Sequence, residues 1–308
     1  MKIFFGAIIC ILVLLCASPM PLFAQMSGQQ QPPEFVKQGQ QLIRDGKPEE
    51  ALALYRQTLK NTPNSTPANI AAGSVLDLMG KGEEARKYFA AAMVAADTPE
   101  GKTAAKRAMA MSYAFEANCG KTIEYEQQVF DFHGGAKNYL QQGETANEAA
   151  RVCLDSGDLE AASKWYNIGH DTGLKEPELK PARRDLWDFR LENAAARIAA
   201  RRSDKMAAQQ HVAAAKAILD KGTNPEQAPF FPALQGYVAF YTGDYKTALA
   251  ELAKANQNDP FIQCLMAQSY EKSGDKEKAL EYYRKAASSA SHNPAAAYAV
   301  PLARKKLS

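Results

Sequence analysis

The chain has 308 residues, of which 46% are apolar, and its 37 basic and 34 acidic side chains leave a formal net charge of +3. This length and hydrophobicity allow a full buried core, so they exclude a chain that is disordered throughout and a small domain stapled by disulfides. The nearly balanced charge argues against a nucleic-acid-binding domain, which is strongly basic. A mean hydropathy of −0.38 with a single long apolar run argues against several membrane spans.

The first 24 residues have the order of a secretory signal. A basic start at Lys2 is followed by an apolar run over residues 3–15 and by a stretch with proline and small residues that ends at Ala24. We therefore expect residues 1–24 to be a signal peptide and the protein to be exported, to the periplasm or outside a bacterial cell. Residues 25–33 are rich in Gln, Ser and Pro, which predicts a flexible linker.

Lipid anchoring at Cys16 is the alternative for this N-terminal segment. Cys16 follows Val13, Leu14 and Leu15, which loosely resembles the lipobox of bacterial lipoproteins, although that box has a small residue directly before the cysteine. Contact with a membrane is predicted only if Cys16 is lipidated, and an outer-membrane lipoprotein is the less favoured location.

A fixed offset of 34 residues relates the first two units of the remaining chain. The first unit contains Gly39, Leu42, Gly46, Ala51 and Tyr55, and the second contains Gly73, Leu76, Gly80, Ala85 and Phe89. The same spacing returns from Gly236 and again, after a shorter unit, from Ala267. Apolar residues recur at three- and four-residue steps on both sides of a glycine-containing turn, which predicts two amphipathic helices in antiparallel contact.

This pattern resembles the tetratricopeptide repeat family, whose units are helix pairs of 34 residues. The resemblance implies an all-α fold, a right-handed superhelical solenoid of antiparallel helix pairs with a C-terminal capping helix. We expect the solenoid to cover residues 34–308, with a cap over 294–307 and about seven units at 34–65, 66–99, 103–133, 143–175, 185–220, 229–259 and 260–291. The third unit has an uncertain register, and the fifth lacks the turn glycine.

Removal of a signal peptide would leave three cysteines, Cys119, Cys153 and Cys264, so at least one thiol is unpaired or bonded to another chain. A Cys119–Cys153 disulfide and the burial of these cysteines as small apolar side chains both remain open. The four histidines are scattered and no cysteine spacing is typical of zinc, so we predict no metal site.

No motif of an enzyme is present. Residues 120–122 read Gly-Lys-Thr, but a phosphate-binding loop also needs a glycine five residues earlier, where Phe115 stands. We predict a protein that is not an enzyme and has neither catalytic residues nor a cofactor.

The resemblance implies a concave surface lined by the first helix of each unit. Transferring the family's inner-face positions to units four to six predicts the partner-binding residues Arg151, Arg190, Asn193, Arg197, Arg201, Tyr237, Phe240 and Tyr241. Residues 180–205 contain eight basic and four acidic side chains, whereas residues 34–102 contain nine of each. Arginine suits carboxylates and aromatic rings supply contact area, so we expect a protein partner that presents an extended or acidic peptide.

Two alternatives stay open for these residues and for the function. The arginines could pair with Asp188, Glu192 and Asp204 near them in the sequence, and the aromatic residues could belong to the core between repeats. The lysine and asparagine clamp of chaperone adaptors in the family is absent. The predicted function is an exported interaction scaffold, and the alternative is an envelope-associated structural or assembly factor.

Overall fold

The computed structural model describes residues 32–308, and residues 33–308 form one unit of α-helices. The predicted signal peptide, most of the predicted linker and Cys16 lie outside the described residues. Among the helices of this part of the chain, none is both long enough and apolar enough to cross a membrane.

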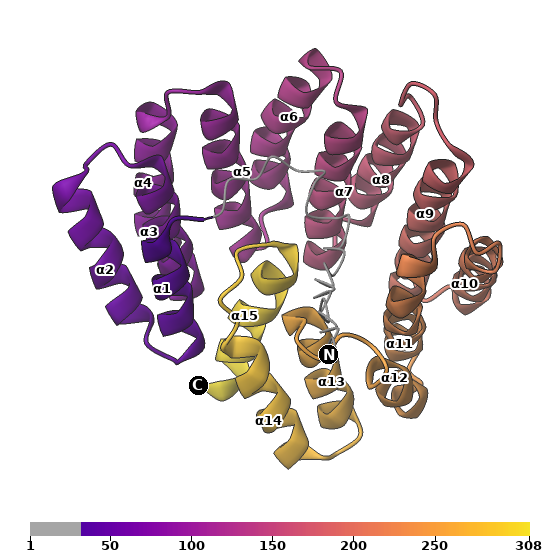
Figure 1. The fold of residues 1–308 in the computed structure, drawn as a ribbon. Helices are drawn as coiled ribbons and strands as arrows, with labels where there is room; N and C mark the ends of the chain where they lie inside the picture. Colours follow the sequence, from indigo (N-terminus) through magenta and orange to yellow (C-terminus); the bar gives the residue numbers. More distant parts are fainter. Residues whose placement is uncertain (1–31) are drawn as a thin grey trace, which may run out of the picture. The chain divides into compact units, whose positions relative to one another are not determined.

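Helices follow one another in pairs along residues 33–308, and no strand occurs in this range (Figure 1). The all-α, solenoid fold class predicted from the sequence is confirmed. A short 3₁₀ segment, η2 (Pro225–Phe230), precedes α11. The helices are α1 (Glu34–Arg44), α2 (Pro48–Asn61), α3 (Thr66–Leu78), α4 (Gly82–Ala95), α5 (Pro99–Phe115), α6 (Cys119–Gly135), α7 (Tyr139–Ser156), α8 (Leu159–Gly173), α9 (Pro181–Arg201), α10 (Lys205–Leu219), α11 (Phe231–Tyr241), α12 (Tyr245–Leu252), α13 (Pro260–Lys272), α14 (Lys276–Ala287) and α15 (Pro294–Leu307).

Short polar side chains define where most helices begin. Asn118 at the start of α6 accepts a hydrogen bond from the Lys121 backbone N–H, and Asp158 does the same for α8 through the N–H of Ala161. Such caps satisfy N–H groups that have no partner within the helix. Proline in the first turn marks other starts that lack such a cap, including those of α2 and α9.

The turn inside each pair needs a residue with positive φ. Glycine takes this conformation in five pairs, for example Gly46 and Gly157. The third and fifth pairs use Ala117 (φ 55°) and Ser203 (φ 61°) instead. This places the turn of the third pair at Ala117, whereas Gly120 belongs to the first turn of α6.

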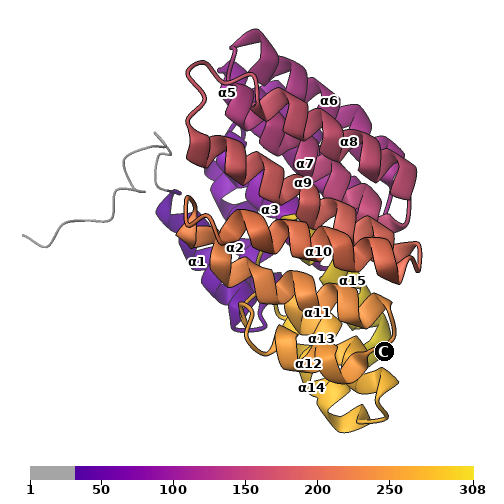
Figure 2. The ribbon, with the colours of Figure 1, turned by 90° about the vertical axis from the view of Figure 1, so that its right-hand side faces the viewer.

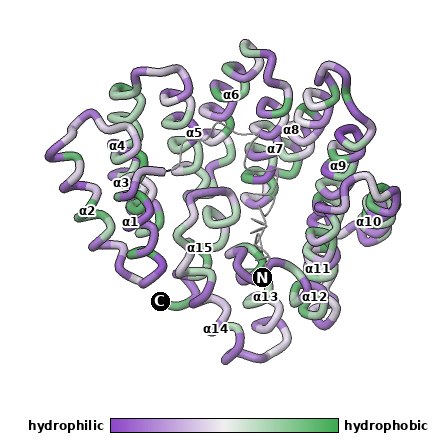
Figure 3. The backbone as a smooth tube through the Cα atoms, viewed as in Figure 1, coloured by the Kyte–Doolittle hydropathy of each residue, from purple (hydrophilic) through white to green (hydrophobic). Residues whose placement is uncertain are grey.

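Small residues on the first helix allow a large side chain of the second helix to approach. A Cβ atom at Gly73 would lie 2.5 Å from the Phe89 ring, and one at Gly39 would lie 2.0 Å from the Tyr55 hydroxyl. Both aromatic side chains are buried. Along most helices, hydrophobic and hydrophilic residues are interspersed (Figure 3), so one face packs inward while the other meets water.

Each pair also packs against the next. Contacts join α2 to α3, α4 to α5, α6 to α7 and α8 to α9, and Figure 2 shows helices α7 to α12 layered one after another. The buried clusters therefore run from repeat to repeat.

The last helix returns to the early repeats. Helix α15 covers α13 and α14, and it also packs against α5 and α7 (Figure 1). His292, just before α15, places Nε2 2.8 Å from Asp77 Oδ2, and its ring stacks on Phe115. Ser112 donates a hydrogen bond to the other oxygen of the fully buried Asp77 carboxyl group.

Candidate functional site

Ion pairs join successive first helices in the middle of the chain. Arg107 on α5 donates two hydrogen bonds to Glu148 on α7, at 2.8 and 2.9 Å. Arg190 on α9 donates to Glu144 on α7 at 2.7 Å. These two pairs, which we call the first-helix ladder, connect α5, α7 and α9 and are partly exposed to solvent.

Five of the predicted partner-binding residues come together in an arginine–aromatic cluster. It consists of Arg151 on α7, Arg197 and Arg201 on α9, Tyr237 and Tyr241 on α11, and Phe261 on α13. Arg151 lies 4.0 Å from the centre of the Phe261 ring, and Arg197 lies 4.5 Å from that of Tyr237. Stacking of this kind is favourable because the ring face is negative. The cluster thereby joins the first helices of four pairs.

One carboxylate serves two arginines of the cluster. Asp155 on α7 accepts a hydrogen bond from Arg151 Nε at 2.6 Å and one from Arg197 Nη2 at 3.4 Å. Its side chain is only 6% exposed, so this pairing takes place away from bulk water. The cluster contains three guanidinium groups for this one carboxylate, and the aromatic faces compensate part of the excess positive charge.

Burial limits what the cluster can offer to a partner. Tyr237 is 1% exposed and Arg197 is 7% exposed, so both have almost no free surface. Burial raises the pKa values of the Tyr237 and Tyr241 phenols, which keeps both hydroxyls protonated. The Tyr237 hydroxyl and Arg151 Nη2 have no hydrogen-bond partner within the described residues.

The remaining predicted residues retain more surface. Arg190 is 28% exposed and lies 4.9 Å from the centre of the Trp187 ring. Asn193 and Phe240 are half-buried, and Asn193 makes no side-chain hydrogen bond within the described residues. Arg201 Nη1 lies 3.4 Å from the Tyr241 hydroxyl, and both side chains are half-buried.

The charge partners expected from nearby sequence positions were wrong. Arg190 and Arg197 pair with carboxylates of α7, not with acidic residues of α9. Asp188 instead lies 2.9 Å from His170, Glu192 lies 2.7 Å from His211, and Asp204 caps α10. The reason is geometric for Arg190, because Asp188 and Glu192 lie two positions from it, and side chains at this spacing do not face each other on a helix.

A disulfide joins the third and fourth pairs. Cys119, at the start of α6, is bonded to Cys153 on α7, which resolves the two alternatives left open by the sequence in favour of the disulfide. Cys264 is a free thiol in the core, and burial raises its pKa to about 12. A buried neutral thiol is not nucleophilic.

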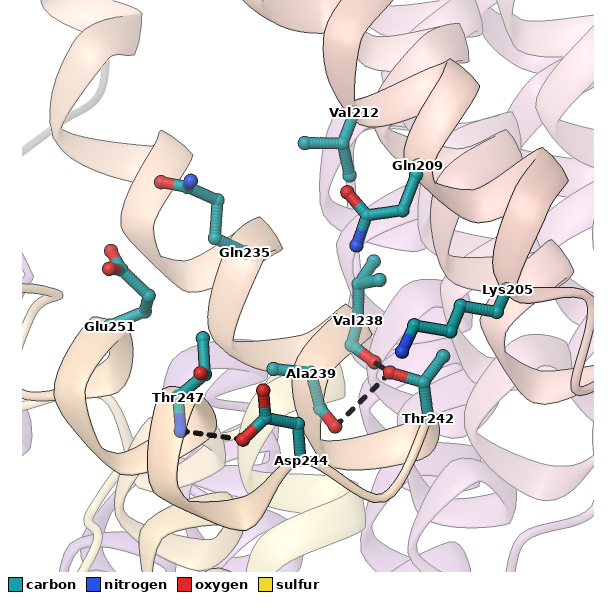
Figure 4. Close-up of a pocket in the computed structure, with 10 residues that line it drawn as sticks. All are labelled: Lys205, Gln209, Val212, Gln235, Val238, Ala239, Thr242, Asp244, Thr247 and Glu251. Carbon is teal, nitrogen blue, oxygen red and sulfur yellow. Dashed lines mark hydrogen bonds between the residues drawn. The ribbon is translucent and has the colours of Figure 1, made fainter.

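Two pockets were not foreseen from the sequence. One, of about 200 Å³, lies between α10, α11 and α12 (Figure 4). Two of its polar side chains are engaged locally, since Thr242 donates to the Val238 carbonyl and Asp244 caps α12. A second, of about 400 Å³, lies between α8, α9 and α10 over a floor of small apolar residues. Both pockets are formed by helices of successive repeats, so no local sequence pattern predicts them.

Comparisons with known proteins agree with the helical pairs. The tetratricopeptide repeat family matches residues 262–293, which cover most of α13 and α14. The apo form of RapI has a TM-score of 0.51 at 14% identity, with 89% of this chain and 97% of that chain covered. The fold is a solenoid of helix pairs, similar to that of tetratricopeptide repeats. At this identity the structural likeness shows the fold alone.

A second solved structure is also similar to this chain. It is a tetratricopeptide repeat protein from Parabacteroides merdae, with a TM-score of 0.47 and 12% identity over 88% of this chain and 98% of that chain. No curated protein sequence matches the chain.

Proposed function

We propose that this protein is an exported scaffold that binds a protein partner through the first-helix face of its fourth to sixth repeats. The observation that carries the proposal is the tetratricopeptide-repeat fold, which is consistent with protein–protein interaction and is generally a non-catalytic scaffold. The signal-like N-terminus supports export, and so does the Cys119–Cys153 disulfide, because such bonds persist in oxidising compartments.

The eight predicted partner-binding residues divide into two roles in this proposal. Arg151, Arg197 and Tyr237 maintain the shape of the surface, because their side chains are engaged or buried in the arginine–aromatic cluster. Contact with an extended or acidic peptide falls to the five residues that retain surface, which are Arg190, Asn193, Arg201, Phe240 and Tyr241. An acidic side chain of the partner would compete with Glu144 for Arg190.

Affinity capture with matched variants tests this division. Full-length protein is expressed in its native envelope, and captured partners are identified by mass spectrometry. The double variant Arg190→Ala/Asn193→Ala should capture at least about tenfold less partner than the wild type, as expected when one arginine contact is removed. Arg202→Ala is the control, because Arg202 directly follows the same helix but pairs with Glu160 on α8.

Thermal unfolding of each variant shows whether lost capture reflects lost folding. Capture that is unchanged in the folded double variant would refute the proposed surface. The N-terminus of the envelope protein tests export separately, since cleavage after Ala24 is expected. Incorporation of labelled palmitate at Cys16 would instead support the envelope-anchored alternative.

A further inference from the structure

The eighth residue of every second helix occupies one recurring core position. In six of the seven pairs this residue is apolar or aromatic and buried, namely Tyr55, Phe89, Tyr166, Val212, Leu252 and Tyr283. In the third pair the same position is Glu126, whose side chain is also 0% exposed. A carboxyl group thus takes the place of a hydrophobic core residue.

Glu126 has no partner for its polar atoms. Both carboxyl oxygens are buried, and neither accepts or donates a hydrogen bond within the described residues. Thr122 and Val129, on the same face of α6, are buried as well, and the Thr122 hydroxyl donates to the Ala110 carbonyl at 3.2 Å. An ionised carboxylate without a partner is far more costly to bury than a neutral carboxyl group.

The charged groups around Glu126 come from both neighbouring helices. Glu148 on α7 opposes its ionisation, and Arg107 on α5 favours it. Arg107 is already committed to Glu148 through two hydrogen bonds. On α6 itself, His133 has a pKa that is lowered by burial and by Arg107.

We propose that Glu126 is a protonated core residue at neutral pH and that the third repeat is a pH-sensitive joint. Loss of the proton creates a second carboxylate that competes with Glu148 for Arg107. This weakens the Arg107–Glu148 pair of the first-helix ladder and loosens α6 between α5 and α7. The disulfide at Cys119 anchors the start of α6, so the loosening is confined to the part of the helix from Glu126 to its C-terminus.

The direction of the pH effect follows from proton binding. Burial is the main cause that raises the pKa of Glu126, and the charge of Glu148 adds to it. The folded state therefore keeps a proton that the unfolded state has released above its ordinary pKa of about 4.3. Stability is complete below that pH and falls as the pH rises toward the folded-state pKa.

Urea unfolding of the full, disulfide-bonded chain between about pH 4 and pH 9 tests the proposal. Relative to Glu126→Gln, the unfolding equilibrium constant of the wild type should rise by up to about tenfold per pH unit above about pH 4.3. Glu124→Gln is the matched control, because Glu124 lies on the same helix but is exposed and paired with Lys121. This control should keep the wild-type pH profile.

Two further measurements make the outcome unambiguous. In carbon-13 NMR of glutamate-labelled protein, the signal absent from Glu126→Gln should show the shift of a protonated carboxyl group at pH 7. In Glu148→Gln the upper end of the pH window should move to lower pH, because a like charge that raises the folded-state pKa of Glu126 is removed. An ionised Glu126 at pH 7, or a wild type and Glu126→Gln with parallel pH profiles, would overturn the proposal.

Discussion

Trp187 on α9 fills a space against α7 and α8. This space exists only because Gly143 and Gly173 have no side chain. A Cβ atom at Gly173 would lie 2.0 Å from Trp187 Cε2, and one at Gly143 would lie 2.7 Å from Cη2. The indole is fully buried and cannot move aside without disturbing the three helices. Both glycines are therefore required for close approach of the indole.

Substitution of Gly173 should be destabilising for this reason. Gly173→Ala is expected to lower the free energy of unfolding by about 1–3 kcal/mol, as overpacked core residues do, and to change the tryptophan fluorescence. Gly135→Ala, at the end of α6, is the control because a Cβ atom there meets nothing within 4 Å. Equal stability of both variants in urea titrations would contradict the packing described here.

At this same scale the sequence predicts some residues and misses others. Burial of Trp187 follows from its size and helical spacing, but the role of Gly143 does not, since it depends on a side chain from another repeat. The partners of Arg190 and Arg197 also depend on another repeat, because α7 supplies both carboxylates. This contradicts the alternative that these arginines pair with acidic residues near them in the sequence. Glu126 could have been recognised by aligning the second helices at their first residues.

At the scale of elements, the regular offset predicts helix pairs because small and large residues must face each other at a fixed distance along the two helices. The register of a pair is harder to predict where the turn residue is not glycine. Ala117 and Ser203 adopt the left-handed conformation without being glycine, so the register of the third pair could not be read from a turn glycine. Packing of the surrounding helices compensates for that local cost.

The disulfide is the strongest link between two elements. Cys119 and Cys153 are 34 residues apart in sequence, and closing a loop of this size stabilises a fold by about 3–4 kcal/mol. A reductant should therefore lower the urea midpoint of the wild type. The double variant Cys119→Ser/Cys153→Ser should have a lower urea midpoint than the wild type, and the reductant should not change it.

Cys264→Ala provides the control for this experiment, because it removes the free thiol and leaves the cross-link. It should remain sensitive to reductant. If the wild type itself is insensitive, the disulfide contributes nothing to stability and the expected stabilisation is wrong.

Within residues 33–308 as a whole, the contact of His292 with Asp77 spans 215 positions of sequence. Repeat arrays are usually stabilised only by neighbours, so their ends unfold independently. Here the last helix also contacts repeats near the start, which couples the end of the array to its beginning. No periodic pattern in the sequence reports such a contact, and the sequence therefore predicts a cap but not its second role.

His292→Ala should uncouple the C-terminal helix. We expect a loss of about 2–4 kcal/mol, because Asp77 stays buried with one hydrogen bond fewer, together with faster amide hydrogen exchange in α15. His211→Ala is the control, since His211 and Glu192 form a half-exposed pair of small energetic weight. Unchanged exchange in α15 would show that His292 is not the connection.

The return of α15 also sets an order of events during synthesis. Met111 on α5 and Val152 on α7 share a buried cluster with Ala296 and Val300 of α15. At about 5–20 residues per second, the 140 residues from Val152 to His292 take roughly 7–28 s to emerge. For that time the nascent chain presents an uncovered apolar surface, the kind of segment that chaperones recognise.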